Sequence, residues 1–464
     1  MPDTEAPRSP DRAPAGGSSA RLPQPSLASL AQRAAISLVL IGWAAWLYFR
    51  MAARSRGWWR QDEASLAAAQ HRFARHFVRV AQRLKGGLIK VGQVASLRVD
   101  VMPAEVTEEL AKLQDRVAPH PYEEIAAQIE RELGRPVDAL FASFEPEALA
   151  SASLGQVHRA RTADGEDVAV KVLYPGVEKS VAVDLAMTKL GLWLFDWITV
   201  ADLMQVYREL RESILGEMDY VREAKAAEEI AANLARDPAV AARVRIPAIR
   251  WDTTSRRVLT MEFLEGVRIN ERARLEAQGR DLQELVTWAS RAFLHMMFRD
   301  GFFHCDPHPG NLLVDAEGRV VIVDFGMNKR VGPDLRQAFR KNLIASIRRD
   351  ADLYAESLVE AGIVSRADVP AVREIARLSF DPRYFNLTPK EVAQLDVGDY
   401  VKEMRGRMKR IRSFQLPDGL VMWSRAASLL YGLSAELAPG LRPLDLFGPY
   451  VLEFLQSGPP PASA

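Results

Sequence analysis

The sequence predicts an α+β protein with more helix than strand, and three observations support that prediction. Apolar residues recur three and four positions apart over most of the chain, which is the spacing of one helix face. Short apolar stretches separated by turn residues interrupt this pattern in three places and predict β-hairpins. The chain has 464 residues, of which 48% are hydrophobic and 26% charged, so it is long enough for two or three packed units.

The composition excludes several classes of protein. The formal net charge is +1 and no dense Lys/Arg run is interleaved with aromatic residues, so we expect no nucleic-acid partner. The chain contains one cysteine, which rules out intrachain disulfides and a zinc site with several cysteines. A reducing, cytosolic face is therefore the expected environment of the folded part.

The N-terminal region divides into a tail and an apolar segment. Residues 1–33 are rich in Pro, Ser, Ala and Gly and predict a disordered tail. Residues 34–53 are almost uncharged and predict a single membrane span, with an interfacial helix as the alternative. Arginines lie at and beyond the end of this segment and place the rest of the chain in the cytoplasm. They are Arg50, Arg54, Arg56 and Arg60.

Residues 60–140 predict a helical extension. Apolar residues at Phe73, Phe77 and Val80 lie three and four positions apart, as on one face of a helix. A break is expected at Met102-Pro103, because proline cannot continue a helix.

Residues 141–265 predict a small β-rich unit. The stretch "GQVHRARTADGEDVAVKVLY" predicts a hairpin that turns at Asp164-Gly165, and "IRWDTTSRRVLTMEF" predicts a second one. Residues 202–235 predict one long charged helix between them.

Residues 266–455 predict a helical body. It is interrupted by a third hairpin, "NLLVDAEGRVVIVDFG", which turns near Gly318. Residues 456–464 predict a second disordered tail.

The stretch "HCDPHPGN", residues 304–311, indicates phosphoryl transfer. Asp306 is followed by Asn311, and Asp324 opens the sequence "DFG" thirteen positions later. Phosphoryl transfer needs a carboxylate for the proton of the nucleophile and oxygen ligands that hold Mg²⁺. The spacing matches the catalytic loop and magnesium motif of protein kinases.

Two alternatives use the same stretch. A zinc site would use His304, Asp306 and His308, and a nucleophile would use Cys305. Both leave Asn311 and the "DFG" sequence unexplained. We therefore expect the two histidines to pack and hydrogen-bond so that they shape the loop.

A kinase also needs a lysine on the α and β phosphates, held by an acidic partner. Strand alternation in "VAVK" buries the valines and frees Lys171. Three acids in "GEMDYVREA" compete for the partner role, and spacing alone does not rank them. They are Glu217, Asp219 and Glu223.

The chain departs from ordinary protein kinases. "LASASLGQV", Leu149 to Val157, replaces the glycine-rich loop, so the backbone approaches phosphate less freely. Cys305 stands where regulated kinases carry an arginine. Helical pattern resumes directly after "DFGMNKR", which leaves no long activation segment as a platform for a peptide substrate.

These features together resemble the UbiB (AarF) family of atypical kinases. The resemblance covers about residues 80–330 and lies in "KVGQ" with "LAKLQDRVAP", "ASASLGQVHRA", "VAVKVLYPGV", "EMDYVREA", "LTMEFLEGVRI" and "FFHCDPHPGNLL…VDFG". It implies a two-lobed protein-kinase-like fold, with a small β-rich N-lobe and a helical C-lobe. It also implies that the N-terminal helical extension, named KxGQ after its motif, lies over the substrate cleft.

The resemblance also implies roles for individual residues. Lys90 and Gln93 would point into the active site, faced by Glu217 and Asp219, and Glu223 would be the partner of Lys171. Asp306 would be catalytic. The magnesium ligands would be Asn311 and Asp324. The nucleotide would be held by Lys171, by the alanine-rich loop and by the backbone at the adenine edge: Leu149, Ala150, Ser151, Ala152, Ser153, Val157, Glu262, Phe263 and Leu264.

The function implied is that of a membrane-associated, Mg²⁺-dependent ATPase or kinase of a small or lipid substrate. It would support isoprenoid-quinone (ubiquinone) biosynthesis or lipid homeostasis at a bacterial-type inner membrane, with quinone-biosynthesis proteins as possible partners. The alternative is a nucleotide-sensing scaffold that organises a membrane complex without turnover. A true protein kinase is a third reading.

Overall fold

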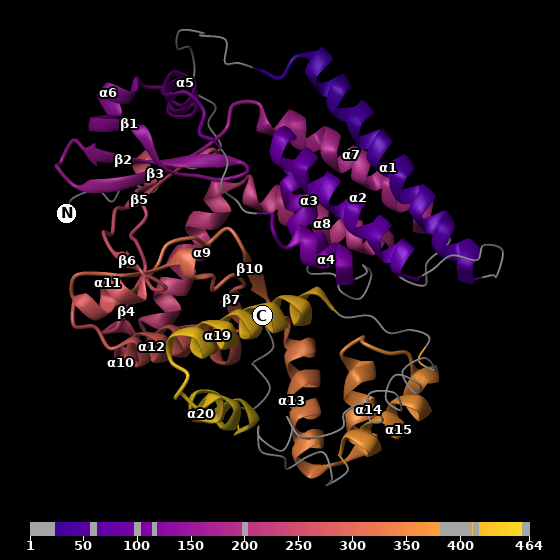
Figure 1. Cartoon of the computed structure of the whole chain (residues 1–464). Coiled ribbons are helices and arrows are strands. Elements are labelled where there is room, and N and C mark those ends of the chain that lie inside the picture. Colours follow the sequence, from indigo (N-terminus) through magenta and orange to yellow (C-terminus); the bar gives the residue numbers. More distant parts are fainter. Residues whose placement is uncertain are drawn as a thin grey trace, which may run out of the picture. The chain divides into compact units, whose positions relative to one another are not determined.

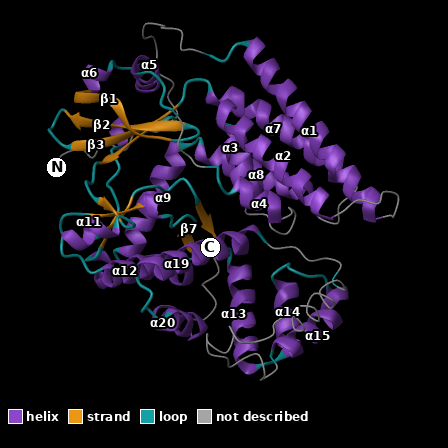
Figure 2. Ribbon diagram, viewed as in Figure 1, coloured by secondary structure: helices purple, strands orange, loops and turns teal. Residues whose placement is uncertain are grey.

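The computed structural model describes residues 24–55, 63–96, 104–113, 118–196, 203–380, 411 and 417–456. Helices dominate and the strands form small sheets (Figures 1 and 2), which confirms the α+β prediction. The chain forms two compact units. Unit 1 contains Met1–Glu228 and Pro247–Leu264, and unit 2 contains Glu229–Ile246 and Glu265–Ala464.

Unit 1 begins with a group of helices. α1 lies along α7 and also packs on α2, and α3 packs on α2, α4 and α7 (Figure 1). Their core is made of small and aliphatic side chains such as Ala74, Ala81 and Ile89. The helices are α1 (Leu27–Ser55), α2 (Glu63–Leu84), α3 (Gly87–Ser96), α4 (Ala104–Leu110), α7 (Val177–Asp196) and α8 (Leu203–Glu217). The break predicted at Met102-Pro103 lies outside the described residues.

Helix α1 starts earlier than predicted. It begins at Leu27, so residues 27–33 are helical and do not belong to a disordered tail. The hydroxyl of Ser26 accepts a hydrogen bond from the N–H of Ser29 at 3.1 Å, which satisfies one of the open donors at a helix start. Residues 1–23 lie outside the described residues, as do Arg56 and Arg60.

An antiparallel sheet completes unit 1, preceded by α5 (Tyr122–Leu133) and α6 (Val137–Leu140). Its strand order is β1-β2-β3-β5. The hairpin of β2 and β3 turns at Gly165, whose φ is 87°, so the first predicted hairpin is confirmed. The strands are β1 (Phe141–Ser151), β2 (Gly155–Thr162), β3 (Asp167–Leu173) and β5 (Val258–Glu262).

The second predicted hairpin forms only in part. β5 pairs with β3, and the segment before it makes a single bridge, Ile249 to Met261, and a short 3₁₀ turn, Trp251–Thr253. The hydroxyl of Thr254 accepts a hydrogen bond from Thr260 N–H, and the hydroxyl of Thr260 donates to the Thr253 carbonyl. These side-chain bonds compete with a regular ladder.

The single helix predicted over residues 202–235 is wrong. The structure has α8 and a separate α9 (Tyr220–Leu234). The N–H of Tyr220 donates to the carbonyl of Arg256 at 3.0 Å, on the segment before β5. Asp219 then caps the start of α9, because its carboxylate accepts from the N–H of Arg222 at 3.4 Å. The break places Glu217 and Glu223 on different helices.

Unit 2 contains two small sheets. The first has the order β4-β9-β8-β6, and the second pairs β7 with β10. β8 and β9 form the third predicted hairpin, which turns at Gly318 with a φ of 85° and is confirmed. The strands are β4 (Val244–Arg245), β6 (Val267–Arg268), β7 (Phe302–His304), β8 (Leu312–Val314), β9 (Val320–Ile322) and β10 (Asn328–Arg330).

The rest of unit 2 is helical. α12 continues as a π-helix, His295–Asp300, that ends at Gly301 with a φ of 65°. β10 ends at Arg330 and α13 begins at Pro333, so the predicted absence of a long activation segment is confirmed. The helices are α10 (Pro238–Ala241), α11 (Arg272–Ala277), α12 (Leu282–Leu294), α13 (Pro333–Arg348), α14 (Ala351–Glu360), α15 (Val369–Ser379), α19 (Asp418–Leu437) and α20 (Pro443–Gln456). The second tail was predicted over residues 456–464, but Gln456 is the last residue of α20. Residues 457–464 lie outside the described residues.

Candidate functional site

Lys171 and Glu223 form an ion pair in unit 1. Alternation along β3 buries Val170 and Val172, so Lys171 projects from the opposite face. Its Nζ lies 2.8 and 3.0 Å from the two carboxylate oxygens of Glu223, in the first turn of α9. Glu223 is buried, with 4% of its surface exposed. Of the three competing acids, the partner of Lys171 is thus Glu223, as the family resemblance implied.

A second ion pair joins the extension to α8. The Nζ of Lys90 lies 2.8 Å from a carboxylate oxygen of Glu217, and both side chains are largely buried. This contact agrees with the expectation that the "KVGQ" element faces Glu217. The amide of Gln93 donates to the carbonyl of Leu113 at 3.2 Å.

Asp219 does not join the Lys90 pair, contrary to expectation. Its carboxylate accepts from the N–H of Arg222 and lies 3.8 Å from the Nε of Arg256. The reason is the helix break, because Asp219 directly precedes α9 and its carboxylate caps the start of that helix.

The alanine-rich loop is shorter than predicted. Ala150 and Ser151 belong to β1 and pair with Val157 and Gln156 of β2, so only residues 152–154 connect the strands. Ala152 N–H donates to the carbonyl of Gly155 at 2.8 Å, which makes the turn tight. The hydroxyl of Ser153 is buried and has no hydrogen-bond partner among the described residues.

The predicted adenine edge follows β5. The N–H of Phe263 donates to the carbonyl of Asp167 at 3.0 Å and is engaged inside the sheet. The N–H of Glu262 donates to the carbonyl of Ala248 at 2.8 Å. Of the three predicted residues, Leu264 alone keeps a backbone N–H without a hydrogen bond to the described part of the chain.

The Asp306 loop of unit 2 is shaped by two histidines. The Nδ1 of His304 accepts from the N–H of Asp306 at 3.0 Å, and the Nδ1 of His308 accepts from the N–H of Gly310 at 3.1 Å. Each histidine thus binds a backbone N–H two residues further along the loop. The histidines therefore shape the loop, as expected from the sequence in preference to a zinc site.

Cys305 is unsuited to act as a nucleophile. It is buried, and burial raises the pKa of its thiol far above the usual range, whereas a thiolate is the reactive form. Its N–H donates to the carbonyl of Met327 at 2.9 Å, which fixes β7 beside β10.

Asn311 and Asp324 are brought together by backbone pairing. The amide of Asn311 donates to the carbonyl of Asp306 at 3.2 Å and to its carboxylate at 3.4 Å. The N–H of Val323 donates to the carbonyl of Asn311 at 3.1 Å, one residue before Asp324. One carboxylate oxygen of Asp324 accepts from the N–H of Gly326 at 2.8 Å. Unit 2 therefore gathers all three predicted oxygen-bearing side chains.

A family model described as "ABC1 atypical kinase-like domain" matches residues 112–358, more than half of the chain. The chain belongs to this ABC1 family. The family confirms the predicted UbiB resemblance and the two-lobed kinase-like fold.

Individual ABC1 relatives agree with this assignment. The chain is 32% identical to the probable protein kinase UbiB of Marinobacter nauticus, over 79% of this chain and 67% of that protein. It is 33% identical to the chloroplastic protein ACTIVITY OF BC1 COMPLEX KINASE 7 of Arabidopsis thaliana, over 79% of this chain and 52% of that protein. It is also 35% identical to an uncharacterized Synechocystis protein, over 80% of this chain and 63% of that protein.

The chain spans between about half and two thirds of the length of most of these curated relatives. Among solved structures, it resembles Rv3197 of Mycobacterium tuberculosis in complex with erythromycin, with 26% identity and a TM-score of 0.47. That similarity covers 78% of this chain and 94% of the solved one.

One residue of this ABC1 site was not predicted from the sequence. The Nη2 of Arg425, on α19, lies 2.7 Å from a carboxylate oxygen of Asp306. The Nε of Arg425 is buried and has no hydrogen-bond partner among the described residues. The arginine is 119 positions away from Asp306 and belongs to no motif that we identified, so the sequence held no signal for it. A cation therefore reaches Asp306 although Cys305 replaces the usual neighbouring arginine.

Proposed function

We propose that this ABC1 chain is a Mg²⁺-dependent, ATP-binding enzyme that hydrolyses ATP or transfers its γ-phosphoryl group to a small or lipid acceptor. The proposal is supported by one observation: the polar side chains needed for this chemistry are present, and they form two sets that each lie within one unit. Unit 1 holds Lys171 against Glu223, and unit 2 gathers Asp306, Asn311 and Asp324. In kinases these two sets act on one nucleotide.

Unit 1 supplies the groups that would bind the phosphates and the base. Lys171 is a cation whose position is set by buried Glu223, which is the arrangement that contacts α and β phosphates in kinases. The buried hydroxyl of Ser153 lacks a partner among the described residues and can donate to a phosphate oxygen. The N–H of Leu264 is available for the adenine edge.

Unit 2 supplies a donor set that fits magnesium. Because the amide nitrogen of Asn311 is directed at Asp306, its amide oxygen is left as a ligand. Together with the carboxylate of Asp324 this gives hard oxygen donors, which Mg²⁺ prefers. The ion would neutralise charge on the β and γ phosphates when bound.

Asp306 is the residue that we expect to accept the proton of the attacking hydroxyl or water. Arg425 contacts one of its carboxylate oxygens and Asn311 the other. These two contacts fix the direction of the carboxylate before the acceptor arrives. A preset orientation lowers the entropy cost of reaching the reactive geometry.

A small or lipid acceptor is favoured over a peptide. Only residues 331 and 332 separate β10 from α13, so the segment on which protein kinases seat peptides is missing. On the resemblance to UbiB proteins, we infer a role in isoprenoid-quinone biosynthesis or lipid homeostasis.

We further propose that α1 attaches the protein to a membrane. Residues Leu27–Arg54 are long and apolar enough to span one, and 22% of the apolar stretch is buried. The contacts of α1 favour the interfacial alternative to a span. Arg33 pairs with Asp184 of α7, and the ring of Trp43 lies 5.6 Å from that of Phe73. A spanning helix would lose both contacts. The opposite face exposes Leu38, Val39, Trp46 and Phe49.

Vesicle flotation tests this attachment. Val39→Asp and Phe49→Asp place charges on the exposed face and should each reduce binding to vesicles of anionic phospholipid, whereas Ser29→Asp, near the start of α1, should not. Resistance of the parent to alkaline carbonate extraction would instead support a span.

The enzymatic proposal is tested by a magnesium titration of ATP turnover, with and without lipid headgroup mimics. The parent should require Mg²⁺, and Asp324→Asn should raise the required Mg²⁺ concentration and lower maximal turnover. Asp334→Asn changes an exposed carboxylate in the first turn of α13 and should match the parent. Turnover that is insensitive to Mg²⁺ and to Asp324→Asn would refute the proposal.

A nucleotide-sensing scaffold is the second candidate. The Lys90–Glu217 pair favours it, because the pair holds α3 of the extension against α8. ATP-induced thermal stabilisation without hydrolysis, also in Lys90→Ala and Gln93→Ala variants, would support the scaffold. Hydrolysis that depends on Asp306 would exclude it.

The biological role is tested separately. Quinone and lipid profiles of a deletion strain should be restored by the parent chain and not by Asp306→Asn. Equal restoration by both chains would show that the role does not need phosphoryl transfer.

A further inference from the structure

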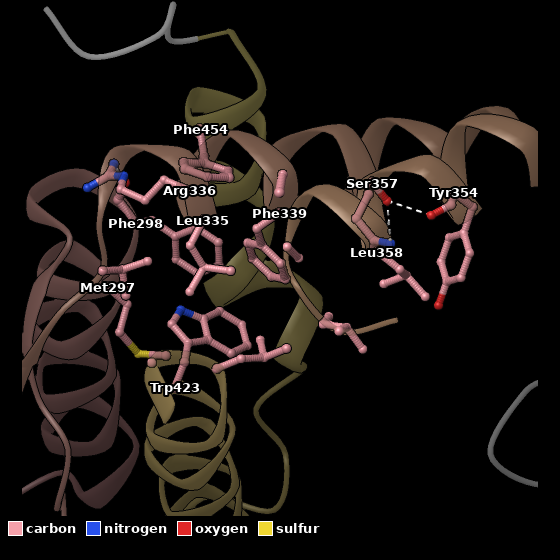
Figure 3. A pocket seen from close by; sticks show the side chains of 17 residues that line it. Met297, Phe298, Leu335, Arg336, Phe339, Tyr354, Ser357, Leu358, Trp423 and Phe454 are labelled. Atoms are coloured by element: carbon pink, nitrogen blue, oxygen red, sulfur yellow. Dashed lines mark hydrogen bonds between the residues drawn. The ribbon is translucent and has the colours of Figure 1, made fainter. Parts of the chain in front are cut away.

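Unit 2 contains an apolar cavity of about 290 Å³, shown in Figure 3. Its wall comes from the π-helix after α12 and from α13, α14, α19 and α20, and none of the catalytic residues contributes to it. Protein interiors rarely contain voids much larger than a water molecule. An apolar cavity of about 150 Å³ already binds benzene, so this one has room for a larger apolar ligand.

Aromatic rings form the middle of the wall. Figure 3 shows Phe298, Phe339, Trp423 and Phe454 around the open space. The rings of Phe339 and Trp423 lie 5.1 Å apart, and those of Phe298 and Phe454 lie 5.7 Å apart. Their contacts with one another hold the wall in place, so the cavity is preformed.

The polar groups of the wall satisfy one another. The amide of Asn342 donates to the hydroxyl of Ser357 at 3.0 Å, and that hydroxyl donates to the carbonyl of Tyr354 at 2.7 Å. These groups therefore offer few free hydrogen-bonding atoms to a polar ligand. A ligand that buried its own polar atoms against the rings would also lose hydrogen bonds to water. The wall thus selects a hydrocarbon body.

Arg336 is the only charged side chain among the residues that line the cavity. One of its nitrogens donates to the carbonyls of Phe298 and Arg299, and it forms no ion pair with the described residues. Burial lowers the pKa of its guanidinium, against the opposing effect of Asp300. In Figure 3 it lies on the other side of the rings from Ser357 and Tyr354, so an anionic group could be bound at one end.

We propose that this cavity binds the hydrocarbon chain of an amphipathic lipid whose anionic headgroup pairs with Arg336. The chain lies between the aromatic rings, and the headgroup lies at the Arg336 end. This site is separate from the phosphate chemistry of Asp306 and does not depend on it. A carboxylate and a phosphate share the required charge, and the probes below distinguish them.

The test uses dodecanoate, dodecyl phosphate and dodecanol, each below its micelle concentration, with the full chain. Binding is measured by thermal stabilisation and by quenching of tryptophan fluorescence with a brominated dodecanoate, and Trp423→Phe identifies the quenched residue. We expect one or both anionic probes to bind about tenfold more tightly than the alcohol, as a charge-assisted contact implies. Acetate and inorganic phosphate should not stabilise the protein.

Three variants make the test specific. Ala361→Phe fills the cavity from the end of α14 and should abolish binding, whereas Ala367→Phe adds the same ring at an exposed position and should not. Arg336→Gln should remove the preference for anionic probes, and Arg336→Lys should retain it. ATP binding should be unchanged in Ala361→Phe, which separates this site from the proposed enzymatic one. Failure of all probes to bind, binding unaffected by Ala361→Phe, or equal binding of anionic probes and alcohol to the parent would overturn the proposal.

Discussion

The guanidinium of Arg425 lies 2.7 Å from the carboxylate of Asp306, across 119 positions of the chain. Because this contact orients the carboxylate, Arg425→Ala should lower kcat on the order of a hundredfold and leave the KM for ATP nearly unchanged. Arg425→Lys keeps the charge and should retain part of the activity. Ser428→Ala changes an exposed residue of the same helix and serves as the control. A loss that appears in KM alone would contradict a positioning role.

The pair of Lys90 and Glu217 should stabilise the extension. Both side chains are largely buried, and removing one partner of such a pair leaves an uncompensated charge that costs about 3 kcal/mol. Lys90→Met and Glu217→Gln should therefore each lower the free energy of unfolding, measured by denaturant titration. The double variant Lys90→Met/Glu217→Leu should recover most of the loss. Equal destabilisation by the single and double variants would show that packing, and not charge, is decisive.

Sequence reasoning succeeded where a short motif fixes its own geometry. Alternation in "VAVK" places Lys171 on the open face of β3, and the spacing from Asp306 to Asn311 closes a short loop. It failed where a distant backbone group decides the structure. The break between α8 and α9 depends on Tyr220 donating to Arg256, and no local signal marks that partner.

The same limit explains two other differences. Arg425 reaches Asp306 from a helix whose sequence pattern shows only an ordinary amphipathic segment. The predicted disordered tail also included Arg33, which lies in α1 and whose side chain is held by Asp184 of α7. Both contacts join residues more than a hundred positions apart, and periodicity describes one segment at a time.

His158 should make the stability of unit 1 depend on pH. Burial lowers the pKa of its ring, although the carbonyl of Glu145 opposes this. Gln156 exchanges two hydrogen bonds with the backbone of His120, which directs its amide N–H at the Nε2 of His158, 2.9 Å away. In the charged ring Nε2 carries a proton, and that N–H would point at the amide N–H of Gln156. Two donors cannot hydrogen-bond to each other, so the folded state disfavours the charged ring.

The sign of the pH effect follows from this shift. An unfolded histidine binds a proton below about pH 6.5, and the folded ring does not, so stability should fall as the pH drops through that value. His158→Gln should reduce this loss in thermal unfolding measured between about pH 7.5 and 5.5. Ser143→Gln, at an exposed position of β1 that does not titrate, should leave the slope unchanged. A parent protein equally stable across this range would contradict the argument.

Arg33 should attach α1 to the rest of unit 1. Its guanidinium contacts both oxygens of Asp184 and the carbonyls of Leu84 and Lys85. Arg33→Met leaves the buried Asp184 without its cation, and should increase hydrogen exchange along α1 and cleavage next to it by trypsin. Gln32→Met, at the neighbouring exposed position, is the matched control. Unchanged exchange in Arg33→Met would show that the apolar contacts with α7 suffice.

The most direct test of the proposed chemistry measures ATP turnover and ATP affinity together for the parent and Asp306→Asn. Asparagine has nearly the same shape as aspartate but cannot accept the proton, so turnover should fall about 10²- to 10⁴-fold while the dissociation constant for ATP stays within about threefold. Asp334→Asn should behave as the parent. Turnover by Asp306→Asn at the parental rate would contradict the account.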